Sequence, residues 1–447
     1  MNAGFDLLAQ QISELGLGKS AGRVSSVRGG TIGLAGLADH VGVGDRVRIR
    51  RQSGPPLDGT VIRIADGDVS LLPDGGTDAV AIGDAAVRLD RRTFAPGDHW
   101  IGRIVDAEGA PLDDMPLFRA GPARPLETAP PPAAGRAALG DRLSTGLAVF
   151  NTVLPIASGQ RMGLFAGSGV GKSTLLGQLA RGMAADVVVV ALIGERGREV
   201  NEFIRHTLGP DGLRRSVVVA ETSDRPATAR RRCAWAAMAV AEHFRDQGRS
   251  VLLLVDSVTR FAEAHREIAT ASDELPALRG YPPSLVPLIT ALCERAGPGL
   301  EGAGTITAVF SVLVAGSDMD EPVADILRGV LDGHVVLERA IAERGRFPAV
   351  DVGRSVSRCL PDAATDEENQ MIGQVRRLLG LYERTETMIR AGLYSEGTDP
   401  ELDEAVRLWP DLDAFFARRE TGGIGDSFDR LGVLLRRMRN RPDPHPG

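Results

Sequence analysis

The chain contains 447 residues, of which 43% are hydrophobic and 25% are charged. This length predicts about three domains, and this composition is typical of a folded globular protein rather than a disordered one. No stretch approaches the roughly 18 consecutive apolar residues that a membrane-spanning helix needs. The net charge of −7 and the aromatic content of 4% disfavour a broad nucleic-acid-binding surface.

The N-terminal sequence and the cysteines favour a cytoplasmic protein. The N-terminal sequence MNAGFDLLAQQISELG has no basic region followed by a long apolar run, so a secretory signal is not expected. Cys233, Cys293 and Cys359 lie far apart, and no CxxC motif is present. We therefore expect neither a disulfide scaffold nor a zinc site.

Residues 4–16 are predicted to form a short amphipathic helix. Phe5, Leu8, Ile12 and Leu15 recur at steps of three and four residues, which places them on one face. Such a helix is too short to be stable alone in water, so we expect it to pack on the rest of the chain or to bind a partner. Of these two alternatives we favour the partner.

The next segments predict a small β-domain and an extended connection. In residues 21–92, short β-rich runs alternate with Gly, Asp and Pro turns, a pattern typical of a barrel or sandwich. The runs are 22–27, 46–50, 59–64, 69–72 and 86–89. Residues 99–112 predict one further strand–turn–strand unit, and the proline-rich residues 116–136 predict an extended crossing segment.

Residues 93–365 predict an α/β domain. Their apolar runs are nearly continuous in Val, Ile and Leu, as expected for a parallel sheet buried on both faces. The predicted strands are 162–166, 187–193, 217–220, 251–255, 306–313 and 335–337, and residues 224–247 predict a long helix. Residues 366–447 predict a helical domain, with helices near 367–391, 399–418 and 424–439.

Residues 161–185 predict a phosphate-binding loop between a strand and a helix. Glycines let the main chain turn tightly and point successive N–H groups at an anion, beside a helix N-terminus. The lysine would reach the terminal phosphates and the serine hydroxyl would ligate Mg²⁺. The candidate nucleotide-binding residues are Gly167, Ser168, Gly169, Val170, Gly171, Lys172, Ser173 and Thr174. The GxxxxGK[ST] pattern expects glycine where this chain has Ala166, a small residue that we expect to be tolerated.

The lysine count supports a specific role for this loop. Of the 52 basic residues, only Lys19 and Lys172 are lysines, and the other 50 are arginines. A lysine retained against this bias indicates a site that needs a compact ammonium group on a flexible side chain rather than the planar guanidinium group of arginine.

Three further residues are candidates for the chemistry. Asp256 ends the buried strand VLLLVD and would hold Mg²⁺, although a strand-end acid can also cap a turn. Glu195 follows another buried strand and would polarise the attacking water, with a salt-bridged surface acid as the alternative. Arg260 would sense the γ-phosphate or serve a structural role.

Together these residues resemble the catalytic subunits of the rotary ATPase superfamily, and in particular the type III export ATPases of flagella and injectisomes. The resemblance covers essentially the whole chain. It rests on GQRMGLFAGSGVGKSTLL (159–176), IGERGREVNEFI (193–204), LLLVDSVTRFAEAHREI (252–268), LRGYPPSL (278–285), VAGSDMDEPVAD (314–325) and RFPAVDVGRSVSR (346–358).

The resemblance implies a Mg²⁺-dependent ATPase that works as a homohexamer and energises flagellar protein export. It implies that Arg358 is an arginine finger that enters a neighbouring subunit's site, and that Phe347 packs against adenine. It also implies a RecA-like core over 93–365, an N-terminal β-barrel over 21–92 and a C-terminal helical domain over 366–447.

The same resemblance implies several partners. The N-terminal segment 1–20 would dock to the flagellar ATPase regulator, or stator, and residues 317–325 would approach a central stalk protein. The C-terminal domain would contact export chaperones and substrates. The implied location is the cytoplasm, with peripheral contact at the inner face of the cytoplasmic membrane.

Other functions remain open at this point. An injectisome ATPase, an ATP synthase β subunit and an RNA-translocating hexamer are the enzymatic alternatives. The missing DELSEED-like acidic motif disfavours the β subunit, and the acidic charge balance disfavours the RNA translocase. A nucleotide-gated docking platform with incidental hydrolysis is the alternative from another class, and the presence of Glu195 argues for activity.

Overall fold

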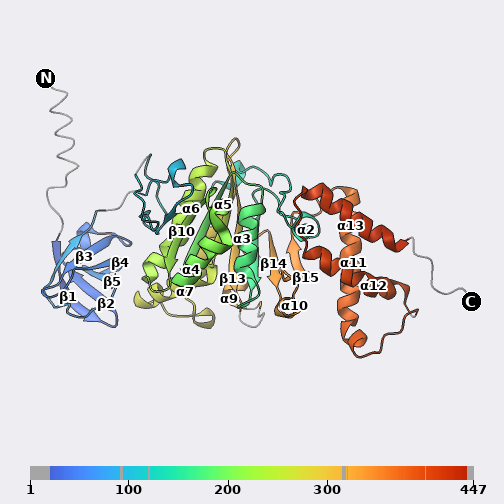
Figure 1. Ribbon diagram of the computed structural model, residues 1–447. Helices are drawn as coiled ribbons and strands as arrows, with labels where there is room; N and C mark the ends of the chain where they lie inside the picture. Colours follow the sequence, from blue (N-terminus) through green and yellow to red (C-terminus); the bar gives the residue numbers. More distant parts are fainter. Residues whose placement is uncertain are drawn as a thin grey trace, which may run out of the picture. The chain divides into compact units, whose positions relative to one another are not determined.

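The computed structural model describes residues 21–90, 94–118, 121–314, 319, 321–397 and 399–439 (Figure 1). The helix predicted at 4–16, the C-terminal tail from 440 and most of the loop at 315–320 lie outside these residues. The described residues fall into two compact units. The first contains 21–90, 225–229 and 263–283, and the second contains the remainder.

A closed antiparallel barrel forms the N-terminal part of the first unit. Its strands are β1 (Ala21–Arg28), β2 (Thr31–Ala35), β3 (Arg46–Arg50), β4 (Leu57–Ala65), β5 (Asp68–Pro73) and β6 (Ala85–Arg88). They close in the order β1-β2-β5-β4-β3-β6. Alternate residues such as Ile32, Leu34, Val69 and Leu71 fill its interior, since side chains alternate across a strand. The barrel prediction is therefore confirmed over the sandwich.

One barrel strand, β2, was missing from the predicted set. It pairs with β1 through a two-residue turn in which Gly29 and Gly30 both have positive φ, at 50° and 90°. Gly-Gly is a strong signal for such a hairpin because both central residues need φ above zero. The turn was therefore predictable from the sequence, although Gly33 interrupts the apolar pattern of the short strand that follows the turn.

A predominantly parallel sheet forms the centre of the second unit. Its strand order is β15-β14-β8-β13-β11-β9-β10-β7, and β12 pairs with β13. Among the described strands of this sheet, only β14–β15 and β12–β13 pair antiparallel. The bounds are β7 (Ile104–Val105), β8 (Arg161–Ala166), β9 (Val187–Glu195), β10 (Ser216–Thr222), β11 (Ser250–Asp256), β12 (Gly297–Pro298), β13 (Thr305–Leu313), β14 (Gly333–Leu337) and β15 (Val350–Ser357). All six predicted core strands are confirmed.

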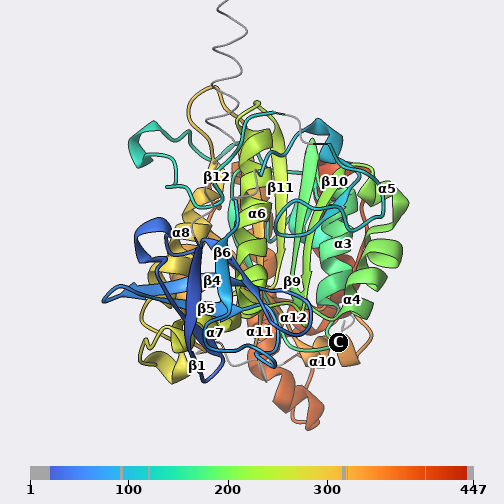
Figure 2. The same cartoon turned by 90° about the vertical axis from the view of Figure 1, so that its left-hand side faces the viewer.

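Helices cover both faces of this sheet, as Figure 2 shows for α3, α4 and α6 around the strands β9–β11. The α-helices that lie between β7 and β15 in the chain are α2 (Ala148–Asn151), α3 (Lys172–Gly182), α4 (Gly197–Glu202), α5 (Gly209–Leu213), α6 (Ala227–Arg245), α7 (Val258–Ala271), α8 (Leu285–Arg295), α9 (Pro322–Val330) and α10 (Arg339–Glu343). A π-helical segment, η4 (Phe203–Leu208), joins α4 to α5. Short 3₁₀ turns occupy Ala38–His40, Asp98–Trp100, Ala133–Gly135 and Leu278–Gly280.

The described part of the crossing segment 116–136 contains no strand or α-helix, as predicted, and a buried ion pair anchors it. Arg295 of α8 donates to both carboxylate oxygens of Glu242 on α6, at 2.9 and 2.8 Å. Both side chains are at most 5% exposed. The same guanidinium donates to the carbonyl of Leu126 at 2.7 Å, so one cation ties α6, α8 and the crossing segment together.

Replacing Arg295 with methionine is expected to lower the free energy of unfolding by about 3–5 kcal/mol, because Glu242 would remain buried without its cation. Chemical denaturation at pH 7 measures the change. The matched control is Arg214→Met. Arg214 pairs with Asp211, but the two side chains are 72% and 79% exposed, so a loss below about 1 kcal/mol is expected. Equal losses in the two variants would contradict a structural role for the buried pair.

Three helices follow the sheet, as predicted: α11 (Asp366–Arg390), α12 (Pro400–Phe416) and α13 (Gly423–Arg439). Thr365 and Glu368 form a reciprocal capping box that starts α11, and Asp399 caps α12. Asn151 of α2 joins these helices to the core through Ser427 of α13, at 3.0 Å. Among the described helices, none is both long and apolar enough to cross a membrane.

Candidate active site

The glycine-rich loop has the conformation that the sequence predicts. It runs from the end of β8 at Ala166 to the start of α3 at Lys172. Gly169 and Gly171 have φ of 78° and 89°, a left-handed conformation that glycine adopts without steric cost. Ala166 is fully buried, so a small apolar side chain fits the first position of the motif. The N-terminus of α3 therefore adjoins a turned main chain that can bind phosphate.

The predicted lysine and the two predicted acids meet at one edge of the sheet. Lys172 follows β8, Glu195 ends β9 and Asp256 ends β11, and the carboxyl ends of these parallel strands face the same way. The Lys172 ammonium forms an ion pair with Asp256 Oδ1 and lies 3.9 Å from Glu195 Oε1. The three side chains are between 4% and 15% exposed. The structure thus brings together a cation and two carboxylates in a largely dehydrated space.

The environment of Glu195 raises the pKa of its carboxyl group. Burial, followed by the charge of Asp256, raises its pKa to about 7, while Lys172 and Arg260 act in the opposite direction. Its Oε1 is buried and accepts no hydrogen bond from the described residues. A carboxyl group with a pKa near the working pH can take a proton from water and release it again.

A cavity of about 210 Å³ opens beside these groups. Its lining residues are Ser173, Thr174, Leu192, Glu195, Glu199, Val200, Glu202, Phe203, Thr207 and Asp256. Ser173 supplies a hydroxyl and Asp256 a carboxylate, the oxygen donors that Mg²⁺ prefers. The residues present therefore fit a magnesium ion. The η4 segment packs tightly on α3, since a Cβ at Gly177 would lie 2.4 Å from Thr207 Cγ2.

Two other predicted residues lie near the loop. The Phe347 ring adjoins it, because a Cβ added to Gly171 would lie 3.1 Å from Phe347 Cδ1, and 47% of Phe347 is exposed. Arg260 on α7 lies beside the residue that precedes Glu195, since a Cβ at Gly194 would be 3.3 Å from Arg260 Cβ. Its charge lowers the pKa of Glu195, which places Arg260 within electrostatic reach of the site.

Arg358 does not reach the loop of its own chain. It follows β15, and its N–H donates to the carbonyl of Asp332, whose own N–H donates to the carbonyl of Arg161. Arg161 is the first residue of β8, and the phosphate loop follows the last residue, Ala166. The length of β8, about 17 Å, therefore separates the neighbourhood of Arg358 from the loop. The Arg358 side chain is exposed and donates to the carbonyl of Arg328 at 3.3 Å.

Sequence reasoning missed one polar residue of the site. Ser311 of β13 is fully buried, and its hydroxyl donates to Asp256 Oδ1 at 2.8 Å. The available signal was a serine inside an otherwise apolar strand, because buried hydroxyls almost always have a hydrogen-bond partner.

The raised pKa of Glu195 predicts a pH-dependent stability. Below about pH 4.5 the carboxyl is protonated in both states, and between about 4.5 and 7 the folded chain binds the extra proton. Stability from this group is therefore lost as pH rises through that window. We expect the melting temperature of Glu195→Gln, relative to wild type, to increase from pH 5 to pH 8. A constant difference across this range would contradict the shift.

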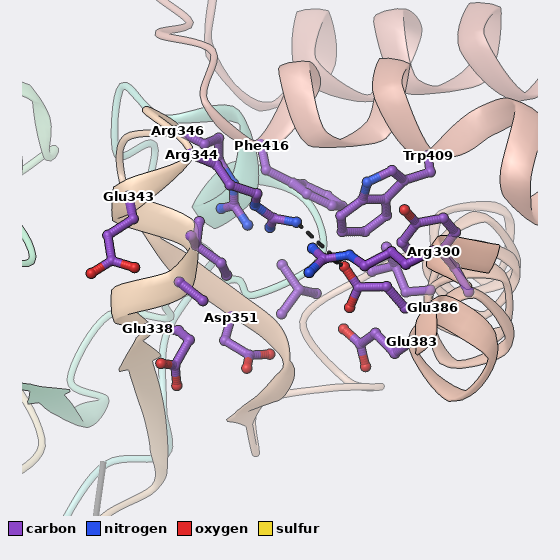
Figure 3. Close-up of a pocket in the computed structure, with 15 residues that line it drawn as sticks. Glu338, Glu343, Arg344, Arg346, Asp351, Glu383, Glu386, Arg390, Trp409 and Phe416 are labelled. Atoms are coloured by element: carbon purple, nitrogen blue, oxygen red, sulfur yellow. Dashed lines mark hydrogen bonds and ion pairs between the residues drawn. The ribbon is translucent and has the colours of Figure 1, made fainter. Parts of the chain in front are cut away.

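A second cavity, of about 460 Å³, lies between α10 and β15 on one side and α11 and α12 on the other (Figure 3). The rings of Tyr382 and Trp409 stack in it at 4.3 Å. Two of its guanidiniums form ion pairs: Arg390 lies 2.7 Å from Glu386, which also lines the cavity, and Arg346 lies 3.1 Å from Asp413. None of the predicted site residues lines it, so the candidate active site is the smaller cavity.

Two sequence families match the chain. The nucleotide-binding domain of the ATP synthase alpha/beta family matches residues 146–357, and the T3SS EscN ATPase C-terminal domain matches 364–421. The assembled ATPase EscN of the enteropathogenic E. coli type III secretion system has a similar structure. It has a TM-score of 0.83 and 36% identity over 93% of this chain and all of that chain. EscN in complex with its central stalk EscO gives a TM-score of 0.82 at 35% identity, with the same coverage.

Named relatives extend this similarity over nearly the whole chain. The flagellum-specific ATP synthase of Caulobacter vibrioides is 46% identical over 93% of this chain and 95% of its own length. The Bacillus subtilis protein of the same name is 41% identical over 89% and 90%, respectively. With its phosphate loop, its strand-end acids and a match of this extent, the chain belongs to the family of flagellum-specific ATP synthases.

Proposed function

We propose that this chain hydrolyses ATP with Mg²⁺ as a homohexameric ring and thereby energises the export of flagellar proteins through a type III secretion apparatus. The observation that carries the proposal is the meeting of Lys172, Glu195 and Asp256 beside a glycine-rich loop. A phosphoryl-transfer site needs such a combination, because catalysis there consists mainly of positioning and charge stabilisation.

In the proposed reaction, the loop main chain and Lys172 bind the β- and γ-phosphates. The Lys172 ammonium, which forms an ion pair with Asp256 in the structure, would move from Asp256 to the phosphate oxygens. Glu195 orients a water molecule in line with the γ-phosphorus and accepts its proton, while the bond to the β-phosphate oxygen breaks. A pKa of about 7 suits this exchange at neutral pH.

Ser173 and Asp256 would hold the magnesium ion, which when bound neutralises charge on the phosphates. The loop residues Gly167, Ser168, Gly169, Val170, Gly171 and Thr174 would complete the nucleotide site with their main chain. Phe347 would contact adenine through its ring face, and Arg260 would sense the γ-phosphate near Glu195.

Arg358 is proposed to act in a neighbouring subunit. Its position about one strand length from the loop of its own chain supports an action in trans, because no local movement of a side chain spans about 17 Å. The assembled state of EscN named above supports a ring for this chain. Catalysis would then depend on assembly.

Further partners belong to the same proposal. The complex of EscN with EscO supports a central stalk partner, which residues 317–325 would approach. The N-terminal segment 1–20 would dock to the regulator, and the helices after 366 would bind chaperones and export substrates. We propose no nucleic-acid partner, and a cytoplasmic location with peripheral contact at the membrane.

An injectisome ATPase is the second candidate, because the solved structures and the C-terminal family come from such a system. The named relatives favour the flagellum. A docking platform with incidental hydrolysis is disfavoured, because the proposed base Glu195 lies 3.9 Å from the Lys172 ammonium beside the phosphate loop.

Deleting the gene tests the proposal directly. We expect cells without filaments that do not swim, restored by the wild-type gene and not by Glu195→Gln. Normal filaments after deletion would exclude the flagellar system, and full restoration by Glu195→Gln would exclude hydrolysis as the source of energy for export.

A further inference from the structure

The Asp256 carboxylate has two hydrogen-bonding partners on the same oxygen. Oδ1 accepts from the Lys172 ammonium and from the Ser311 hydroxyl, the latter at 2.8 Å. Among the described residues, no hydrogen bond reaches Oδ2. Because a carboxylate only accepts, the serine must be the donor. Asp256 itself lines the 210 Å³ cavity together with Ser173.

The position of Ser311 makes this contact rigid. Its strand β13 lies between β11, which carries Asp256, and β8, which leads into the phosphate loop. Ser311 is fully buried and Asp256 is 3% exposed, so no solvent competes for the bond. When Lys172 leaves Asp256 for a phosphate, Ser311 is the remaining described partner of Oδ1.

We infer that Ser311 is a positioning residue, which holds Asp256 Oδ1 against β13 and thereby directs Oδ2 into the cavity for the metal-bound nucleotide. This inference rests on the proposed function. Outer partners that orient a metal-binding carboxylate typically contribute 10- to 100-fold to metal affinity, although they touch neither metal nor substrate.

The test compares Ser311→Ala with Ser311→Thr, which keeps the hydroxyl. Thr307→Ala is the matched control, because Thr307 lies on the same strand, is buried, and accepts from the Gly159 N–H at 2.9 Å instead. The probe is a fluorescent N-methylanthraniloyl-ATP, titrated onto the full-length protein at a series of MgCl₂ concentrations and also without Mg²⁺. The melting temperature of the nucleotide-free protein is measured in parallel.

For Ser311→Ala we expect the Mg²⁺ concentration at half-maximal nucleotide binding to rise by about 10- to 100-fold. Nucleotide affinity without Mg²⁺ should stay within about twofold, and Ser311→Thr and Thr307→Ala should keep the wild-type Mg²⁺ dependence. If Ser311→Ala does not fold, Ser311→Cys, a weaker donor of similar volume, is expected to shift the dependence in the same direction.

Two results would overturn the inference: an unchanged Mg²⁺ dependence in the folded variant, or an equal loss of affinity with and without Mg²⁺. Wild-type protein that fails to bind the probe at any Mg²⁺ concentration would instead overturn the proposed function, so the two failures are distinguishable.

Discussion

Replacing Arg358 with alanine is expected to lower the kcat for ATP hydrolysis by about 10³- to 10⁵-fold while leaving nucleotide binding nearly unchanged. The reason is that a guanidinium supplied from a neighbouring subunit stabilises charge only in the transition state. Steady-state hydrolysis and N-methylanthraniloyl-ATP binding measure the two effects. Arg354→Ala is the matched control, since Arg354 is exposed on β15, the strand that Arg358 follows, and pairs with Glu338 at 2.9 Å.

Mixing subunits decides whether Arg358 acts in trans. Arg358→Ala chains keep an intact loop, and Lys172→Ala chains keep an intact Arg358. A mixed ring therefore contains some complete interfaces, and part of the activity should return on mixing. Two inactive variants that stay inactive together, despite forming mixed rings, would contradict the role in trans.

Glu195→Gln is expected to lower turnover by about 10²- to 10⁴-fold and to retain nucleotide binding. The amide keeps the shape of the side chain but cannot accept the proton of the attacking water. In wild type, kcat/KM should rise as pH increases through about 7, because only the deprotonated carboxylate is a base. The remaining activity of Glu195→Gln should lose this rise.

Glu202→Gln is the control for this prediction. Glu202 lines the same cavity, but its side chain is exposed and it is not among the groups that shift the pKa of Glu195. Its turnover should stay within a few-fold of wild type. Turnover by Glu195→Gln at a similar level would show that Glu195 is not the base.

The strands and helices with a continuous periodic pattern were predictable from the sequence. The core strands β9 and β11 are uninterrupted apolar runs, and the three C-terminal helices keep their period over several turns. By contrast, β15 reads VDVGRSVS, with polar residues and a glycine that conceal its pairing with β14. Residues 99–112 retain only the two-residue β7 and an isolated bridge between Val105 and Pro111.

The proximity of three candidate residues was predictable from the sequence, but their protonation and hydrogen bonding were not. Parallel strands bring their carboxyl ends to one edge, so the meeting of Lys172, Glu195 and Asp256 follows from the sequence pattern. The raised pKa of Glu195 and the bond from Ser311 depend on burial between elements distant in the chain. The separation of Arg358 from the loop depends on strand register, which local sequence does not encode.

The ion pair between Lys172 and Asp256 also bears on which form of the nucleotide the site accepts. The two charges of the pair cancel each other in a largely dehydrated space. A metal-free triphosphate that drew the Lys172 ammonium away would leave the dehydrated Asp256 carboxylate without a counter-ion, next to about four negative charges on the triphosphate. A triphosphate that arrives with its divalent cation would give both the ammonium and the carboxylate a counter-ion, so we expect the pocket to favour the metal-bound nucleotide.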